Sequence, residues 1–349
     1  MPPVRPNIAE MKGYTPGEQP QGVEKFIKLN TNENPYPCSP KVKAAIGRVL
    51  QAGLQKYPDP FATAFRIRAG ELHGIDPDWI LCGNGSDDIL TIVTRAFVGT
   101  SDMIRFANPS YLLYRTMAEI QGAACEIINY NADWSLPAEF AQPNDWVRLV
   151  FLANPNSPSG TMIPPEKIAE LAEALPCPLL VDEAYVDFAD TNCLSLVAEN
   201  EKIMVARTLS KSYALAGLRF GYLVAQPQVI RELTKVKDSY NCDSLSIAGA
   251  TAAIDDQDWL VETRSKILAT RARVSAALAE LGFNVVESQA NFVWCTHDST
   301  PVEPVYRQLK QSGVLVRYML YPGWGDGLRI TVGTDEQVDA CLELLRTLV

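Results

Sequence analysis

The feature that most constrains the fold is a repeated unit: a short apolar segment, then a polar turn-forming loop, then a stretch with helical spacing. Five such apolar segments stand at 79–82, 103–107, 147–153, 179–181 and 202–206. Strands that are apolar along their whole length and alternate with helices are typical of a parallel sheet covered on both faces. The sequence therefore predicts an α/β fold with a mostly parallel sheet sandwiched by helices.

The last hundred residues follow a different pattern. A long amphipathic helix is predicted over 260–283, several strand-like segments follow it, and a final helix is predicted over 335–349. The last two strand-like segments are expected to form a hairpin across residues 321–327. We therefore expect three parts: an N-terminal arm over 1–40 that packs with the small domain, a large cofactor-binding domain over 41–250 and a smaller α+β domain over 251–349.

Charge and cysteine usage exclude several classes of function. The chain has 349 residues with 41 Asp and Glu against 31 Lys and Arg, a net charge of −10. This acidity argues against nonspecific binding to nucleic acid or to anionic membranes. No segment resembles a signal peptide or a membrane span. The eight cysteines lack C-x-x-C spacing and the two histidines are far apart, so we predict no metal site and a cytoplasmic protein.

Polar residues capable of chemistry follow each apolar segment directly. In open parallel sheets, ligands bind beyond the carboxyl ends of the strands, so these loops are expected to meet. The loops are GNGSDD (83–88), NPSY (108–111), NPNSPSG (154–160), DEAY (182–185) and RTLSKSY (207–213).

The residue types in these loops suit one cofactor. Ser86 at a glycine-rich helix start, with Ser210 and Arg219, fits a phosphate. Lys211 offers an amine that can form a Schiff base, and Asp182 ends a strand too apolar to leave a carboxylate without a cationic partner.

Two tyrosines complete the pattern. Tyr185 can donate a hydrogen bond to a phenolate-like oxygen, and Tyr111 offers a ring for stacking. Singly, each residue has an ordinary explanation as a surface lysine, a helix cap or a packed tyrosine. Together, in this order at strand ends, they favour a pyridoxal phosphate site. No G-x-G-x-x-G or P-loop motif supports a rival cofactor.

Further motifs extend over nearly the whole chain in one order: LNTNENPYPCSP (29–40), YPDP (57–60), ANFVW, VLVRY and LRITVGT. On these motifs the chain resembles the fold-type I aminotransferases, and among them the histidinol-phosphate aminotransferases. The resemblance implies pyridoxal 5′-phosphate, a homodimer, and transfer of the amino group of L-histidinol phosphate to 2-oxoglutarate in histidine biosynthesis.

The resemblance also implies roles for individual residues. Lys211 would bind the cofactor aldehyde covalently and then move a proton between Cα and C4′. Asp182 would keep the ring nitrogen protonated, Tyr185 would hydrogen-bond O3′, and Tyr111 would stack on the ring. The phosphate would be held by Ser86, Asp87 through its backbone, Ser210, Arg219 and, from the neighbouring subunit, Tyr57.

The substrate would meet a second set of residues. Arg329 is similar to the arginine that holds the α-carboxylate, and Arg317 and Tyr14 would assist with the other anionic group. Asn34 is expected to join this substrate-binding set. From the alternating pattern alone, both arginines could instead be outward-facing strand residues.

The chain departs from the family pattern at two places. Ser157 stands where the family usually has the asparagine that faces O3′, with Asn156 and Asn154 as candidate substitutes. Asp88 stands where glutamate is usual, which we expect to affect helix packing more than chemistry.

Three other functions stay open at this point. An aromatic amino-acid aminotransferase would share almost every motif, and a threonine-phosphate decarboxylase would use the same cofactor without needing oxoglutarate. A regulatory or structural protein with a dead cofactor site would not need Lys211, Asp182, Tyr185 and Arg219 together.

Overall fold

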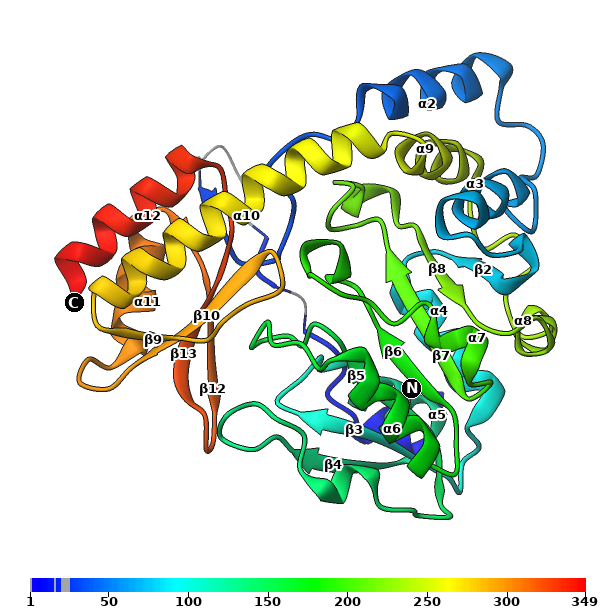
Figure 1. Ribbon diagram of the computed structural model, residues 1–349, viewed down its shortest axis with the longest axis horizontal. Helices are drawn as coiled ribbons and strands as arrows, with labels where there is room; N and C mark the ends of the chain where they lie inside the picture. The colour runs from blue at the N-terminus through cyan, green and yellow to red at the C-terminus, as the bar shows by residue number, and fades with distance from the viewer. Residues whose placement is uncertain (1, 16, 20–25) are drawn as a thin grey trace.

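The computed structural model describes residues 2–15, 17–19 and 26–349, and its centre is a seven-stranded sheet (Figure 1). β8 is antiparallel to both of its neighbours, and every other adjacent pair is parallel. The predicted mostly parallel sheet is therefore confirmed. In spatial order the strands are β2 (Ile80–Gly83), β8 (Gly221–Val224), β7 (Ile203–Thr208), β6 (Leu179–Asp182), β5 (Val147–Ala153), β3 (Met103–Asn108) and β4 (Ala124–Asn129).

The five predicted apolar segments all form strands of this sheet, whereas β4 and β8 were not predicted. β4 lies at the sheet edge and its residues are only partly buried or exposed, so it lacks the apolar run that marks the others. β8 is fully buried, but its four residues directly follow a loop without a separate turn signal.

Helices cover both faces of the sheet and explain why the strands are apolar throughout. Leu149 and Phe151 of β5 pack into one core with α4 (Ser86–Phe97), α5 (Leu113–Gln121) and α8 (Pro227–Thr234). Val150 and Leu152 pack into the opposite core with α3 (Thr63–His73), α6 (Pro165–Ala174) and α9 (Ser244–Ile254). Successive side chains of a strand point to opposite faces, so both sets must be apolar.

A second, antiparallel sheet is formed from later residues, in the order β12 (Arg317–Tyr321), β13 (Gly325–Thr331), β10 (Phe292–His297) and β9 (Phe283–Val285). β12 and β13 are the predicted hairpin, with Tyr321 opposite Gly325. A separate core joins this sheet to α10 (Gln257–Glu280), α11 (Val302–Gln311) and α12 (Asp335–Leu348).

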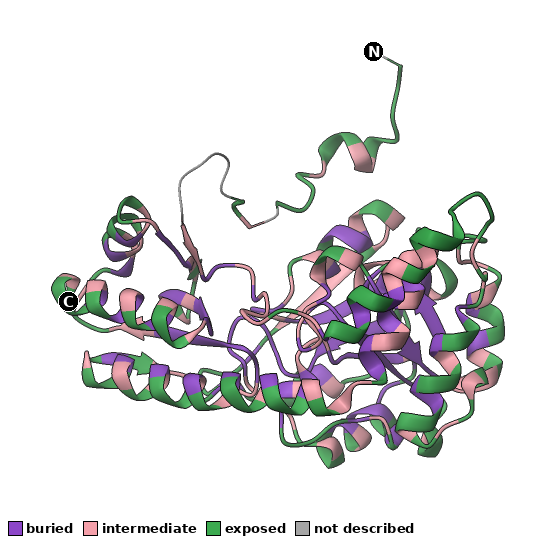
Figure 2. Cartoon of the chain, turned by 90° about the horizontal axis from the view of Figure 1, so that it is seen from above, coloured by how far each residue is buried: buried purple, intermediate pink, exposed green. Residues whose placement is uncertain are grey.

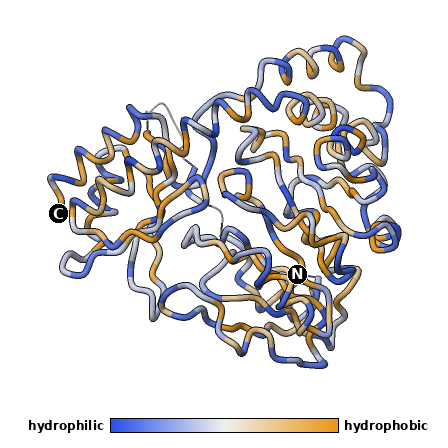
Figure 3. The backbone as a smooth tube through the Cα atoms, viewed as in Figure 1, coloured by the Kyte–Doolittle hydropathy of each residue, from blue (hydrophilic) through white to orange (hydrophobic). Residues whose placement is uncertain are grey.

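α10 and α12 show the alternation of hydrophobic and hydrophilic residues expected of helices with one buried face (Figure 3). α10 runs from the end of α9 along the second sheet, with its buried residues on one side (Figure 2). Within the described residues, no helix is long and apolar enough to cross a membrane.

The N-terminal residues contact both parts of the chain. Arg5 and Asn7, at the start of α1 (Pro6–Glu10), donate hydrogen bonds of 2.8 and 2.7 Å to carbonyls of α5. β1 (Ile27–Lys28) pairs with β11 (Val314–Leu315), and α2 (Pro40–Ala52) packs on α9. The predicted limits at 40 and 250 stay predictions, and residues 1, 16 and 20–25 of the predicted arm lie outside the described residues.

A buried ion pair lies directly behind the end of β6. The Nη2 and Nε atoms of Arg207 lie 2.7 and 2.9 Å from Oε2 of Glu183, whose Oε1 accepts from the backbone N–H of Cys193. The Glu183 side chain is fully buried and that of Arg207 is 9 % exposed. The pair therefore fixes the ends of β6 and β7 relative to each other.

Glu183→Ala should destabilise the protein strongly, because it leaves the Arg207 guanidinium buried without its partner. Breaking a buried ion pair in this way costs about 3–5 kcal/mol. The free energy of unfolding in urea measures the loss. Lys167→Ala, which removes an exposed pair with Glu170, is the matched control and should change it by less than about 0.5 kcal/mol. Equal effects of the two substitutions would contradict this prediction.

Candidate active site

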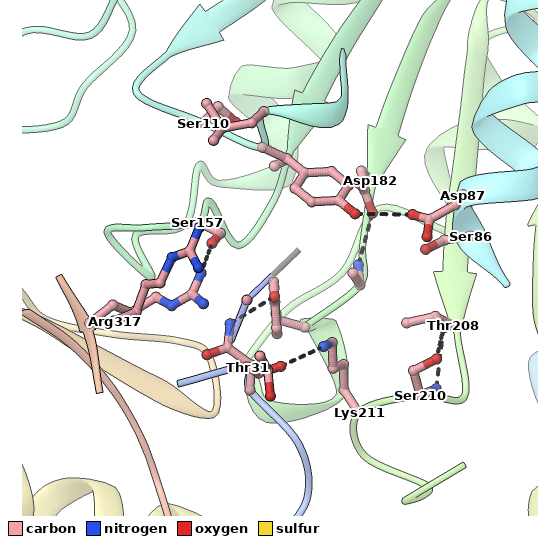
Figure 4. Close-up of a pocket in the computed structure, with 18 of the residues that line it drawn as sticks. Thr31, Ser86, Asp87, Ser110, Ser157, Asp182, Thr208, Ser210, Lys211 and Arg317 are labelled. Atoms are coloured by element: carbon pink, nitrogen blue, oxygen red, sulfur yellow. Dashed lines mark hydrogen bonds between the residues drawn. The ribbon is translucent and has the colours of Figure 1, made fainter. Parts of the chain in front are cut away.

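A pocket opens where the loops after the central strands face β12, β13 and residues 30–32 (Figure 4). The parallel strands end at one edge of the sheet, which brings these loops together. The predicted site residues that line the pocket are Tyr14, Ser86, Asp87, Tyr111, Ser157, Asp182, Tyr185, Ser210, Lys211, Arg219, Arg317 and Arg329. Asn34, Tyr57 and Asn156 do not line it.

Lys211 stands three residues after the end of β7, in a tight turn. The hydroxyl of Thr208 accepts from the backbone N–H of Ser210 at 3.2 Å and so shapes this turn. The Lys211 Nζ atom donates to the backbone carbonyl of Thr31 at 3.3 Å and lies 5.7 Å from the centre of the Tyr185 ring (Figure 4). Within the described residues, no carboxylate lies within ion-pair distance of Lys211. Its amine therefore faces the pocket.

An anion cradle forms at the start of α4. Gly85 precedes the helix with φ +85°, and a Cβ there would lie 2.6 Å from the Arg219 guanidinium. Arg219 reaches the Ser210 hydroxyl at 3.3 Å and the Asp87 carboxylate at 3.2 Å. The free N–H groups of a helix start, a hydroxyl and a fixed cation are the groups that bind a phosphate.

Tyr111 links this cradle to the interior. Its hydroxyl donates to the Asp87 carboxylate at 3.1 Å. Tyr111 also contacts the Tyr114 ring edge-on, with ring centres 5.6 Å apart. Burial raises the pKa of Tyr111, which keeps this phenol neutral.

Asp182 is a buried carboxylate at the end of β6. Its Oδ2 atom accepts from the Tyr114 hydroxyl at 2.8 Å and its Oδ1 atom from the backbone N–H of Ala184 at 3.2 Å. In the described part of the chain no cationic side chain pairs with it. Burial raises the pKa of Asp182 to about 6. The expected cationic partner is thus not a described protein group, and a protonated ligand atom would satisfy this carboxylate.

Tyr114 was missed by the sequence analysis although a signal existed. It stands three residues after Tyr111 in the first turn of α5, and its backbone N–H donates to the Tyr111 carbonyl at 3.2 Å, so the two residues share one short turn.

The two arginines of the hairpin face the pocket rather than solvent. Arg317 and Arg329 stand opposite each other on β12 and β13. Arg329 donates to the Ser157 hydroxyl at 2.9 Å and to the Asn30 carbonyl at 3.1 Å, while its Nε atom has no hydrogen-bond partner among the described residues. Burial lowers the pKa of Arg329. The alternative of outward-facing arginines is wrong, and the pair offers a second anion site.

The departures from the family pattern have structural explanations. The Asn156 amide is already occupied: it accepts from Ser110 at 2.8 Å and donates to the Pro109 carbonyl, both in the loop after β3, and it donates to Ser159 of its own loop. Asn154 is bonded through both of its side-chain atoms to the backbone of Ile163. Ser157 is the residue of this loop whose hydroxyl accepts from Arg329.

Asp88 holds the turn before α4, accepting from the backbone N–H of Asn84 and from the Asn241 amide, both at 2.9 Å. This contact agrees with the packing role expected of it.

The remaining predicted residues lie outside the pocket. Asn34 donates to the Ser212 carbonyl at 2.9 Å and accepts from the backbone N–H of Tyr36, so it supports the loop that carries Lys211. Tyr57 is 80 % exposed and stacks on Tyr240 with ring centres 4.5 Å apart.

Comparison with known proteins identifies the family. The family model of class I and II aminotransferases matches residues 24–345. A histidinol-phosphate aminotransferase of Rhodopirellula baltica is 55 % identical, covering 98 % of this chain and 94 % of the relative. The chain belongs to the class I and II aminotransferases, in the histidinol-phosphate aminotransferase family.

Two other similar proteins agree with this assignment. Histidinol-phosphate aminotransferase 1 of a Nostoc species is 44 % identical, covering 99 % of this chain and 98 % of the relative. The crystal structure of histidinol-phosphate aminotransferase from Sinorhizobium meliloti in complex with pyridoxal-5′-phosphate has a TM-score of 0.89 and 26 % identity, covering 100 % and 99 % of the two chains. The expected fold-type I architecture is confirmed.

This aminotransferase therefore depends on pyridoxal phosphate, as the sequence predicted. The residues of this pocket fit that cofactor. Lys211 presents an amine with no carboxylate partner among the described residues, and Asp182 is a buried carboxylate that lacks a cation there. The start of α4 with Ser210 and Arg219 fits the phosphate.

The raised pKa of Asp182 predicts how pH affects the cofactor-free protein. A carboxyl group whose pKa rises from 3.8 in the unfolded chain to about 6 in the fold contributes stability that is fully present below pH 3.8 and is lost as pH rises through 6. Asp182→Asn cannot ionise and keeps an acceptor for Tyr114. The free energy of unfolding of the Asn variant, relative to that of the parent protein, should therefore increase by about 2 kcal/mol from pH 4.5 to pH 7.

Urea unfolding of both cofactor-free proteins across this pH range measures the effect. Other titrating groups cancel in the difference between the two proteins. A difference that does not change with pH would mean that Asp182 ionises normally in the fold.

Proposed function

We propose that this aminotransferase transfers the amino group of L-histidinol phosphate to 2-oxoglutarate, giving imidazole-acetol phosphate and L-glutamate. The observation that carries the proposal is the presence of two separate anion sites in one pocket. The start of α4 with Arg219 suits the phosphate of the cofactor, and Arg317 with Arg329 is left for the substrate. The names of the relatives support this choice of amino donor.

The arginine pair suits a site that must accept two different anions. Guanidinium groups form paired hydrogen bonds with either a phosphate or a carboxylate. Histidinol phosphate brings a phosphate, and glutamate brings carboxylates. Arg329 would hold the α-carboxylate of glutamate, and Arg317 with Tyr14 would hold the group at the other end. Tyr14 lies beside Tyr111 with ring centres 6.1 Å apart, at the edge of the same pocket.

Four residues would carry the proton chemistry. Pyridoxal phosphate supplies an aldehyde that condenses with amines and a ring that accepts electrons when the Cα proton leaves. Lys211 would hold the cofactor covalently, be released by the amine of the substrate, and then carry the proton from Cα to C4′. Asp182, oriented by Tyr114, would keep the ring nitrogen protonated, and Tyr185 would donate to O3′.

The remaining cofactor contacts follow from the same geometry. Ser86 and the backbone of Asp87 would bind the phosphate from the helix start, with Ser210 and Arg219 beside them, and Tyr111 would stack on the ring. Ser157 would take the position facing O3′, because the Asn156 amide is already bonded to the loop after β3.

We further propose a homodimer located in the cytoplasm. Tyr57 is far more exposed than most aromatic residues of this chain and does not reach the pocket of its own subunit. Leu54, Phe61 and Tyr240 are also exposed, giving an apolar surface that a second copy would cover. In the dimer Tyr57 would reach the cofactor phosphate of the partner.

A second candidate function is supported by the wall of the pocket. Leu112, Met319 and Tyr321 line it together with Tyr14, and these side chains can also contact a phenyl ring. An aromatic amino-acid aminotransferase is therefore the alternative that the experiment must separate.

Loaded with cofactor and given L-histidinol phosphate without an oxo acid, the protein should convert the cofactor to its amine form. The reaction should be at least about tenfold faster than with L-phenylalanine at equal concentration, because a hydrogen-bonded charge contact to arginine contributes roughly 1.5–3 kcal/mol. The reaction is monitored by the loss of the visible absorption band of the bound cofactor. Lys211→Ala is the control and should keep the fold while losing the conversion by orders of magnitude.

Each other result has a definite meaning. Faster conversion with phenylalanine would assign the enzyme to aromatic amino acids, and release of carbon dioxide from a phosphorylated amino acid would assign it to the decarboxylases. Turnover by Lys211→Ala close to that of the parent protein would remove Lys211 from its proposed role.

Tyr57→Phe should weaken cofactor binding by about 10- to 100-fold while leaving the fold intact, since it removes one hydrogen bond to a charged phosphate. Titration of the cofactor-free protein with pyridoxal phosphate, followed by absorbance, measures the affinity. Tyr240→Phe is the matched control, because it keeps the stacked ring pair and has no proposed phosphate contact. A monomer in sedimentation, or equal affinities of the two variants, would contradict the proposed dimer contact.

A further inference from the structure

We propose that Asn32 is a positioning residue that sets the direction of the Tyr185 O–H bond, so that this phenol donates its proton toward the cofactor. The inference deepens the proposed function and rests on Tyr185 facing O3′. Asn32 is 1 % exposed and lines the same pocket.

The backbone of Asn32 is held tightly in an unusual conformation. Its φ is +55°, in the left-handed region that asparagine tolerates better than most residues with a side chain. Its backbone N–H donates to the Thr331 hydroxyl at 3.0 Å, and its carbonyl accepts from the Asn291 amide at 3.1 Å. These contacts come from β13 and from the residue that precedes β10, so they hold Asn32 independently of Tyr185.

The side-chain amide of Asn32 is also oriented. Its Oδ1 atom accepts from the Thr331 hydroxyl at 3.1 Å, which places the Nδ2 atom on the side of Tyr185. Nδ2 donates to the Tyr185 hydroxyl oxygen at 2.9 Å. An amide NH₂ group can only donate, so the phenol oxygen is the acceptor here and its single proton must point elsewhere.

The groups around Tyr185 indicate that its hydroxyl proton points into the pocket. The titratable groups that face it are Lys211 from the loop after β7, Arg329 from β13, and the phenols of Tyr14 and Tyr111. Its ring packs edge-on against Phe292, with ring centres 5.0 Å apart. The two cations cannot accept a hydrogen bond, and among the described residues neither phenol lies within hydrogen-bond distance of the Tyr185 hydroxyl. A negative ring oxygen in the pocket is therefore a suitable acceptor.

This direction has a consequence that can be measured without turnover. A hydrogen bond donated to O3′ draws negative charge from that oxygen, which makes the proton on the Lys211–cofactor linkage easier to lose. Asn32→Asp replaces the donor by an acceptor of the same shape, so the phenol would donate to the new carboxylate instead. The pH midpoint of the visible absorption change in the resting, loaded protein should therefore rise.

A double-mutant cycle separates this effect from that of the new charge alone. Asn32→Asp should raise the midpoint by about one pH unit more in the parent protein than in the Tyr185→Phe background, the difference expected from one hydrogen bond. Asn32→Gly suits the same left-handed backbone and carries no charge, so it tests the inference if the Asp variant folds poorly. Its smaller upward shift should also disappear in the Tyr185→Phe background.

The outcomes distinguish this inference from the proposed function. Equal shifts of the midpoint in both backgrounds would overturn the role of Asn32 while leaving Tyr185 at O3′. A Tyr185→Phe variant with an unchanged midpoint would remove Tyr185 from O3′, and with it the inference. The readout needs only bound cofactor, so it reports on Asn32 even if histidinol phosphate proves not to be the amino donor.

Discussion

The site depends on the burial of two adjacent carboxylates at the end of β6, which the fold treats in opposite ways. Glu183 faces away from the pocket and is neutralised by Arg207, a cation of the protein itself. Asp182 receives two neutral hydrogen bonds, and no cationic side chain of the described residues pairs with it. Burying a carboxylate without a cation is unfavourable, so this arrangement selects a ligand that brings a positive charge. The proposed protonated ring nitrogen would bring such a charge.

The two cores of the large sheet fix the positions of the loops that form the pocket. Alternate residues of β5 pack on opposite helical layers, so the strand cannot shift by one residue without exchanging its two faces. The loops that follow β5, β6 and β7 are therefore held in a fixed register. In consequence Ser157, Asp182 and Lys211 reach one pocket although they are spread over 55 residues of sequence.

Sequence reasoning predicted the residues whose neighbours are implied by topology, and failed where a contact depends on distant parts of the chain. Asp182 ends an apolar strand and Lys211 closely follows another, and such parallel strand ends lie at one edge of the sheet. Asn32 gave no comparable signal, because its partners Tyr185 and Thr331 are 153 and 299 positions away. The bond from Arg329 to Ser157 could not be predicted either, since it joins β13 to the loop after β5, 172 positions away. Local motifs show which reactive side chains are present, whereas only the fold shows which other residues hold those side chains in place.

Residues 30–32 are where these restraints converge. The Asn30 carbonyl accepts from Arg329, the Thr31 carbonyl accepts from Lys211, and the Asn32 amide donates to Tyr185. Three consecutive residues thus hold the proposed carboxylate-binding, proton-transferring and O3′-bonding groups. The proposed substrate-binding arginine and the proposed proton-transferring lysine therefore share one backbone segment as their hydrogen-bond acceptor.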